Sequence, residues 1–194
     1  PLRPFGAELG ADPVLVAVPL AQVRNRLGDY RINLERLRPT AHPLVIQPDL
    51  WVELGRSRAL DQDSAGAEVA FSEALKIDPA HQGALIGRAQ HLIGEGAFAE
   101  AQVLLERALA RPDTAGAQAW FLMGMVHYHA QSLEDALLHY RRALELDPGH
   151  RNAALGEALV MIDQGRLDPA AGLLGEITQQ YPRFLNAHYT YAQV

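Results

Sequence analysis

The amino-acid sequence predicts an all-α fold, a solenoid of antiparallel helix pairs. The first observation is a period: Pro79, Pro148 and Pro182 each follow an apolar helical stretch, and the interval from 148 to 182 is about half of that from 79 to 148. Periods of about 20 to 50 residues are typical of stacked repeat architectures. The second is composition: hydrophobic residues make up 48% of the 194 residues and cysteine is absent, so we expect a packed core without disulfides.

Two copies of the repeating pattern are well defined. Each has a large aromatic residue and a glycine on a first helix, then alanine and a second aromatic on a second helix, and a closing proline. In residues 48–81 and 117–150 these positions hold Trp51, Leu54, Gly55, Ala67, Phe71, Ala74 and Pro79, and Trp120, Met123, Gly124, Ala136, Tyr140, Ala143 and Pro148. Small residues let two helices approach closely, while the rings fill space between neighbouring hairpins.

The spacing W-x2-[LM]-G…A-x3-[FY]-x2-A-x4-P resembles that of the tetratricopeptide repeat family, and both copies carry seven of its eight signature positions. The resemblance implies helix pairs that stack into a right-handed superhelical solenoid, with the first helix of each pair lining a concave groove. One hairpin cannot cover its own apolar face, so stacking several of them buries a continuous core.

The frame divides the whole chain from the N-terminus onward. Its parts are an extended segment 1–13, a degenerate repeat 14–47 with Pro19 in its first helix, repeats 48–81, 82–116, 117–150 and 151–184, and a truncated repeat 185–194. Repeat 82–116 departs from the pattern at Arg88, where an apolar residue is expected. A lone first helix in 185–194 would expose an apolar face, so we expect a fragment of a longer protein, or an end covered by a partner or by a second copy of the chain.

Local signals at helix ends agree with the frame. Asp78-Pro79 and Asp147-Pro148 are expected to end the second helices, because proline removes a donor and restricts the residue before it. Asp168-Pro169 is the opposite signal, an N-cap followed by proline at the first helical position.

Charge argues against nucleic acid as a partner. Formal net charge is −6, and residues 59–194 carry nine Lys or Arg against seventeen Asp or Glu, so no basic stripe is present to follow phosphates. Code-like RNA-reading repeats need basic positions that this array lacks. No apolar run reaches the roughly 18 residues of a membrane span. The cytoplasm and the periplasm are both compatible with this sequence.

Three patterns invite a chemical interpretation, and a structural one is favoured for each. His127 and His129 point about 200° apart on a helix, so they cannot share a metal, although His139 on the next helix can approach one of them. Residues 61–66 resemble the start of a calcium loop but lack later ligands, and Gly94-Glu95-Gly96 has no preceding strand. Both fit turns between helices. We expect no cofactor, no metal and no catalytic residue in this chain.

The resemblance assigns groove-lining positions to the first helices. Carried onto this sequence, the partner-binding residues are Arg26, Arg56, Gln90, Phe121, Met125, Tyr128, His129, Leu155, Leu159, Ile162 and Tyr189, with Asp163 also facing the groove. Family members that clamp acidic chaperone tails carry Lys and Asn where this chain has Val52 and Arg56, Ile86 and Gln90, and Phe121 and Met125. An acidic chaperone tail is therefore disfavoured.

We expect arginine side chains in the N-terminal part of the groove and apolar side chains in its C-terminal part. The apolar part suits an amphipathic helix or an apolar extended segment, unless neighbouring helices cover these side chains and make them core. The favoured function is a scaffold or adaptor that binds a protein segment during complex assembly. The alternative is an accessory repeat region of a larger enzyme, a transferase or an oxygenase, whose catalytic domain lies outside these residues; self-association through 185–194 is compatible with both.

Overall fold

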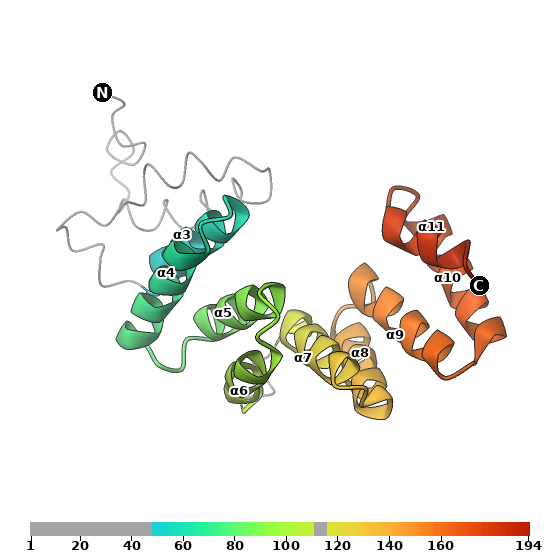
Figure 1. The fold of residues 1–194 in the computed structure, drawn as a ribbon, viewed down its shortest axis with the longest axis horizontal. Coiled ribbons are helices and arrows are strands. Elements are labelled where there is room, and N and C mark those ends of the chain that lie inside the picture. Colours follow the sequence, from blue (N-terminus) through green and yellow to red (C-terminus); the bar gives the residue numbers. More distant parts are fainter. Residues whose placement is uncertain (1–47, 111–115) are drawn as a thin grey trace, which may run out of the picture. The chain divides into compact units, whose positions relative to one another are not determined.

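The computed structural model describes residues 48–110 and 116–194, which form helices and contain no strand (Figure 1). The all-α fold class expected from the sequence is confirmed. The chain divides into two compact units, Pro1–Gly96 and Ala97–Val194. The expected segments 1–13 and 14–47, with Arg26, lie outside the described residues.

The described part of the first unit consists of α3 (Pro48–Leu60), α4 (Ser64–Ile77) and α5 (Gln82–Gly94). A short turn joins α3 to α4, and the two helices pack along each other as an antiparallel pair, with α5 packed against both. Their common core contains Val52, Ala67, Phe71, Ala74 and Ala84. Most of these side chains are small, so the backbones approach closely and the Phe71 ring fills the space that is left.

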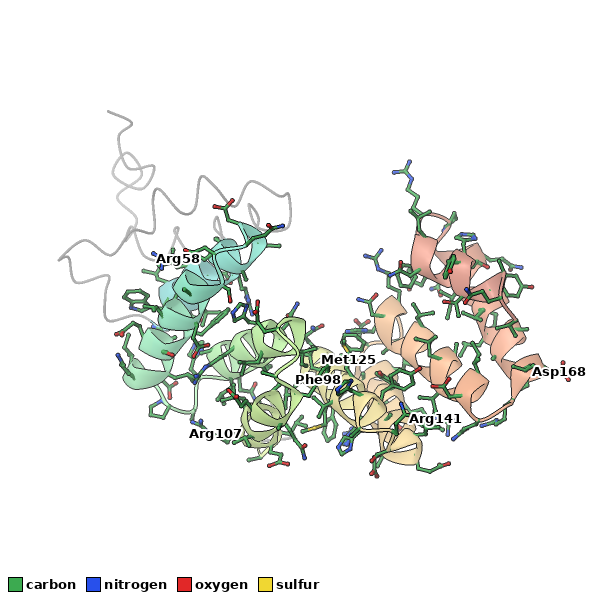
Figure 2. The ribbon with its side chains drawn as sticks, in the orientation of Figure 1. Arg58, Phe98, Arg107, Met125, Arg141 and Asp168 are labelled. Atoms are coloured by element: carbon green, nitrogen blue, oxygen red, sulfur yellow. The ribbon has the colours of Figure 1, made fainter. Side chains whose placement is uncertain are left out.

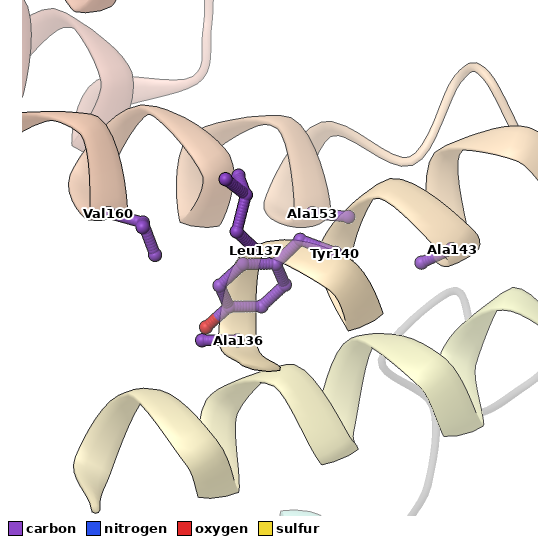
Figure 3. Packing of buried hydrophobic residues seen from close by; sticks show 6 residues of the cluster. All are labelled: Ala136, Leu137, Tyr140, Ala143, Ala153 and Val160. Atoms are coloured by element: carbon purple, nitrogen blue, oxygen red, sulfur yellow. The ribbon is translucent and has the colours of Figure 1, made fainter. Parts of the chain in front are cut away.

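The second unit continues the pattern with six helices in its described residues. They are α6 (Phe98–Leu109), α7 (Ala117–His129), α8 (Leu133–Leu146), α9 (Arg151–Asp163), α10 (Leu167–Gln180) and α11 (Leu185–Tyr191). Helices α7 and α8 pair, as do α9 and α10, while α8 packs on α9 and α10 on α11. Figure 3 shows one core cluster, in which Tyr140 lies among Ala136, Leu137, Ala143, Ala153 and Val160.

The helix stops predicted at Asp-Pro pairs are confirmed. Helix α4 ends at Ile77 and α8 at Leu146, and Asp78 and Asp147 follow with extended backbones, at φ −133° and −140°. The start predicted at Asp168 is wrong, because α10 begins at Leu167 after Arg166. Asp168 lies inside the first turn, where its carboxylate interacts favourably with the positive end of the helix dipole. The next residue is a proline, and its missing N–H costs nothing because an N–H at this position has no partner within the helix.

Short turns that join successive helices share one backbone feature. Gln62, Gly96, Gln131 and Gly165 have φ angles of 63°, 79°, 61° and 73°, which is the left-handed region. They recur at the period of the repeat. The segment 61–66 that resembles a calcium loop is such a turn followed by a helix start, where the Gly66 N–H donates to the Asp63 carboxylate at 2.9 Å.

An aromatic ring between two glycines organises the packing in each unit. A Cβ placed on Gly55 or on Gly87 would lie 2.7 Å from Cε1 of Phe71. In the second unit, a Cβ on Gly124 would lie 2.6 Å from Tyr140, and one on Gly156 would lie 2.7 Å from its Cζ. Each ring therefore touches a glycine of its own hairpin and a glycine of the next helix along the chain, and only glycine leaves room for it.

Charged pairs explain the departure from the repeat pattern at Arg88. Its Nε donates to Glu68 Oε2 at 3.1 Å, and its Nη2 donates to the other oxygen of the same carboxylate, so α5 is joined to α4 by a two-pronged ion pair. The equivalent position of repeat 151–184 is Glu157, which is also charged and accepts from Arg141 Nε on α8 at 2.8 Å.

Candidate functional site

A pocket of about 690 Å³ lies in the first unit, where α3 and α5 face each other. Its lining includes Arg56 and Gln90, which the sequence assigns to the groove at the same position of two successive repeats. Both side chains are exposed. The volume lies within the range of about 300 to 1,000 Å³ that is usual for ligand pockets. The structure thus brings these two predicted residues to one concave surface.

Glu53 orients Arg56 at this pocket. The two are three residues apart on α3, and Arg56 Nη1 donates to Glu53 Oε1 at 2.6 Å. The Glu53 side chain is 2% exposed, whereas that of Arg56 is 42% exposed. A buried carboxylate that holds one edge of a guanidinium leaves the other edge for a ligand. Sequence reasoning missed Glu53, although an acidic residue three places before an arginine on one helix was the available signal.

The opposite wall carries a second polar group that the sequence analysis did not identify. His91 lines the pocket beside Gln90, and its Nε2 lies 3.1 Å from Ser64 Oγ, at the start of α4. Gln90 offers both a donor and an acceptor from its exposed amide. The pocket wall therefore combines a guanidinium, an amide and an imidazole, groups that match the polar atoms of a polypeptide.

The predicted apolar residues of the second unit are partly covered. Phe121, Met125 and Tyr128 on α7 are half-buried against the cluster around Tyr140, and Leu159 and Ile162 on α9 are half-buried against the next cluster. Figure 2 draws these side chains on their helices and labels Met125. Such residues support the core with one side and remain accessible on the other.

Leu155 requires a correction. It is 9% exposed and belongs to the cluster formed with Leu174 of α10 and with Phe184 and Ala187 at α11. The following helices cover it because α10 and α11 pack successively beyond α9. Leu155 is therefore a core residue of the second unit and is not offered to a partner.

Tyr128 and Asp163 form a polar point among these apolar side chains. Burial, together with a side-chain hydrogen bond to Asp163 and the charge of that carboxylate, raises the pKa of Tyr128 to about 12. The phenol thus donates to an exposed carboxylate that the sequence analysis placed on the same face. Asp163 links α9 to α7 and fixes the Tyr128 ring.

Two further predicted residues are exposed on separate helices. His129 is exposed at the end of α7, and its ring stacks on Phe98 of α6 with centroids 3.6 Å apart and planes at 14°. Tyr189 on α11 is 70% exposed. Their roles in binding stay predictions.

The histidines of α7 and α8 do not form a metal centre in the described residues, which contain no group of three or more His, Cys, Asp or Glu side chains suited to an ion. His139 does approach His127, with ring centroids 4.9 Å apart. Among residues 48–110 and 116–194, none of the helices has the length and apolar character needed to cross a bilayer.

Comparison with known proteins gives one family. Two family models, both described as tetratricopeptide repeat, match residues 86–151 and 127–194, and together they cover more than half of the chain. A Pseudomonas putida (strain KT2440) protein, "Probable biofilm formation methyltransferase WspC", is 28% identical over 174 residues, which cover 86% of this chain and 39% of that protein. The chain thus spans well under half the length of this relative.

Solved structures show the same fold. TTC0263, a thermophilic TPR protein of Thermus thermophilus, superposes with a TM-score of 0.74 at 18% identity, covering 93% of this chain and 97% of that chain. YrrB, described as a TPR protein with an unusual peptide-binding site, gives a TM-score of 0.61 at 20% identity and covers 75% of each chain. At these identities the likeness concerns the fold alone.

Proposed function

Because the chain belongs to the tetratricopeptide repeat family, we propose that it is a scaffold that holds a segment of another protein on the first helices of its repeats. Repeats of this family are generally non-catalytic protein-binding scaffolds. The observation that carries the proposal is the pocket of the first unit. There Arg56 and Gln90, at one repeat position of successive repeats, line a single concave surface.

The chemistry of the pocket favours a neutral polypeptide segment over an acidic tail. The charge of Arg56 is already balanced by Glu53 at 2.6 Å. Residues 48–96 carry eight Asp or Glu against four Lys or Arg, so an acidic segment meets like charge around the pocket. Main-chain amide groups, by contrast, offer the donors and acceptors that Arg56 and Gln90 can satisfy.

The half-buried apolar residues of α7 and α9 define the second part of the proposed contact. Phe121, Met125 and Tyr128 are aromatic and thioether side chains, which adapt to partners and give large contact areas. An amphipathic helix or an apolar extended peptide would cover them. The partner segment is therefore expected to be apolar on one side and not strongly acidic.

A phage-displayed random peptide library, selected on the whole chain, tests this proposal. A selected peptide should bind Gln90→Ala more weakly by roughly 0.5–1.5 kcal/mol, the usual contribution of one hydrogen bond. Lys76→Ala is the matched control, because Lys76 lies on α4 of the same unit, pairs with Glu73 and does not line the pocket. Peptides that bind both variants equally, or a selection that enriches none, would contradict the pocket as the binding surface.

The apolar part needs a variant of its own. Tyr128→Ala should weaken binding by roughly 2 kcal/mol or more if the ring is an anchor, with unchanged helical content. Leu155→Ala is unsuitable for this purpose, because it would open a cavity in the core and lower stability. Unchanged affinity of Tyr128→Ala would exclude α7 from the contact.

A second candidate function is favoured by one observation, the relative named as a methyltransferase of which this chain spans 39%. In that case the repeats would act beside a catalytic domain and bring its protein substrate or regulator to it. Removing residues 48–194 from the longer protein should then raise KM for a protein substrate more than it lowers kcat. Loss of methyl transfer to a small acceptor as well would indicate instead that the repeats are needed for folding of the catalytic domain.

A further inference from the structure

Three aromatic rings are stacked between α7 and α8 in the second unit. The His139 ring of α8 lies 5.5 Å from Trp120 and 4.9 Å from His127, centroid to centroid, with interplanar angles of 28° and 25°. Trp120 and His127 are seven residues apart on α7, which is about 10.5 Å along the axis. His139 therefore lies between them and fills the gap between the two helices.

The paired histidines are peculiar to this hairpin. The equivalent two positions of the other described repeats are occupied by Arg58 and Ala70, by Leu92 and Leu104, and by Met161 and Leu173. Two of these three pairs are wholly apolar, and none contains two titratable groups. The first pair is informative because repeat 48–81 carries the same seven signature positions as repeat 117–150, including the tryptophan, yet has neither histidine.

The polar atoms of the stack leave no place for an additional proton. His139 Nδ1 and Trp120 Nε1 are both buried and have no hydrogen-bond partner among the described residues. A neutral imidazole can keep Nδ1 without hydrogen, but a protonated one donates from both ring nitrogens. The indole N–H is itself a donor and cannot accept. Protonation would therefore bury a donor that has no acceptor.

The electrostatic surroundings also disfavour protonation of His139. Burial lowers the pKa of His139, and the neighbouring His127 lowers it further, while Asp135 on the same helix opposes them in part. Asp135 Oδ2 lies 3.9 Å from His127 Nδ1, so the carboxylate faces the outer histidine.

Charged groups of the flanking helices are paired with other residues or are exposed. On α9, Glu157 pairs with Arg141 and Asp163 accepts from Tyr128. On α6, the ionisable side chains Glu100, Glu106 and Arg107 are all exposed. His127 and Asp135 are thus the ionisable groups that act on His139.

We propose that His139 makes the α7–α8 hairpin a pH-sensitive element, in which the neutral ring joins the two helices and the protonated ring separates them. An unfolded histidine takes up its proton near pH 6.5. The folded hairpin takes it up at lower pH, so the unfolded state binds more protons below pH 6.5, and stability present above that pH is lost as the pH falls. The same hairpin carries Phe121, Met125 and Tyr128, so, if the proposed function holds, acid also weakens the hold on the partner segment.

Two measurements on the whole chain test the inference. In an NMR titration of the histidine ring protons, His139 should titrate below pH 6.5, and its midpoint should rise in His127→Leu and fall further in Asp135→Asn. Amide hydrogen exchange, corrected for the intrinsic pH dependence, should show α7 and α8 losing protection between about pH 7.5 and about pH 5.5, either side of the ordinary histidine pKa. Helices α3 and α4 are the internal control and should lose less.

His139→Leu is the decisive variant, because leucine occupies the equivalent position at Leu104 and Leu173. It should keep the protection of α7 and α8 at the lower pH. A His139 midpoint at or above pH 6.5, equal losses in the two hairpins, or an undiminished loss in His139→Leu would each overturn the inference. If His139→Leu does not fold, the titrations of the wild type and of His127→Leu still decide. Peptide binding enters none of these readouts, so failure of the proposed function would leave them unaffected.

Discussion

Replacing Gly156 by alanine should expose the cost of crowding the ring that α8 and α9 share. The added Cβ would stand 2.7 Å from Cζ and 2.8 Å from Cε1 and Cε2 of Tyr140. Carbon atoms in ordinary contact are about 3.5–4.0 Å apart, so the ring must retreat by roughly 1 Å. It has no room, because it is 3% exposed and a Cβ on Gly124, at another point of the ring, would lie only 2.6 Å away.

Two opposing effects set the change in the free energy of unfolding of Gly156→Ala. Overpacking a close-packed core costs about 1–3 kcal/mol, whereas glycine to alanine inside a helix gains about 1 kcal/mol. We therefore expect Gly156→Ala to lower the free energy of unfolding by ~0–2 kcal/mol. Gly172→Ala is the matched control, since it is also helical, in α10, and has nothing within 4 Å of its Cβ. It should raise stability by about 0.5–1 kcal/mol.

Urea unfolding followed by circular dichroism measures both variants. The comparison is then repeated with Tyr140→Leu as background, where the ring is absent and Gly156→Ala should behave like Gly172→Ala. Two results would refute the claim that crowding of the Tyr140 ring destabilises Gly156→Ala. One is that Gly156→Ala is as stable as Gly172→Ala in the wild-type background, and the other is that Gly156→Ala still lowers stability when the ring is absent.

Other perturbations give separate tests. Gly165→Ala should cost about 1 kcal/mol through its backbone alone, since φ is 73° and its Cβ would meet nothing; equal stability in urea would contradict this. Burial and Asp163 raise the pKa of Tyr128 to about 12. The contribution of Tyr128 to the free energy of unfolding is therefore fully present below pH 10 and is lost as the pH rises from 10 to 12. Tyr128→Phe should lessen that loss in alkaline unfolding curves, and an unchanged slope would argue against the hydrogen bond. A double-mutant cycle of Arg88→Leu and Glu68→Gln should give a coupling energy of about 0.5–1 kcal/mol, whereas additive effects would show that the ion pair contributes nothing.

The fold could be predicted because its determinants are local and recur. The glycine and aromatic positions of repeats 48–81 and 117–150 are the same positions that touch in the structure, and the Asp-Pro stops depend only on neighbouring backbone. The start of α10 was mistaken because a proline is tolerated anywhere in the first turn and does not mark its first residue.

The candidate site was less predictable because exposure depends on what lies beyond a helix. Leu155 has the same place in its repeat as Phe121, yet the helices that follow α9 cover it almost completely. The role of Glu53 could not be predicted directly, because it depends on the burial of the carboxylate, which the sequence does not show. The only signal was Arg56, a possible ion-pair partner three residues further along the helix.

The two rings between glycines also mark repeats whose junctions have the same spacing. Phe71 meets Gly87 at the start of one repeat and Tyr140 meets Gly156 at the start of another, and the interval from ring to glycine is the same in both (71 to 87, 140 to 156). His81 and His150 cap the helices that begin there, each accepting from the backbone N–H three residues on. Excising residues 82–150 would therefore join α4 to α9 with Gly156 opposite Phe71 and one capping histidine in place. Glu157 would then take the place of Arg88 beside Glu68, so an exchange of repeats keeps the contact between ring and glycine but replaces the ion pair with two like charges.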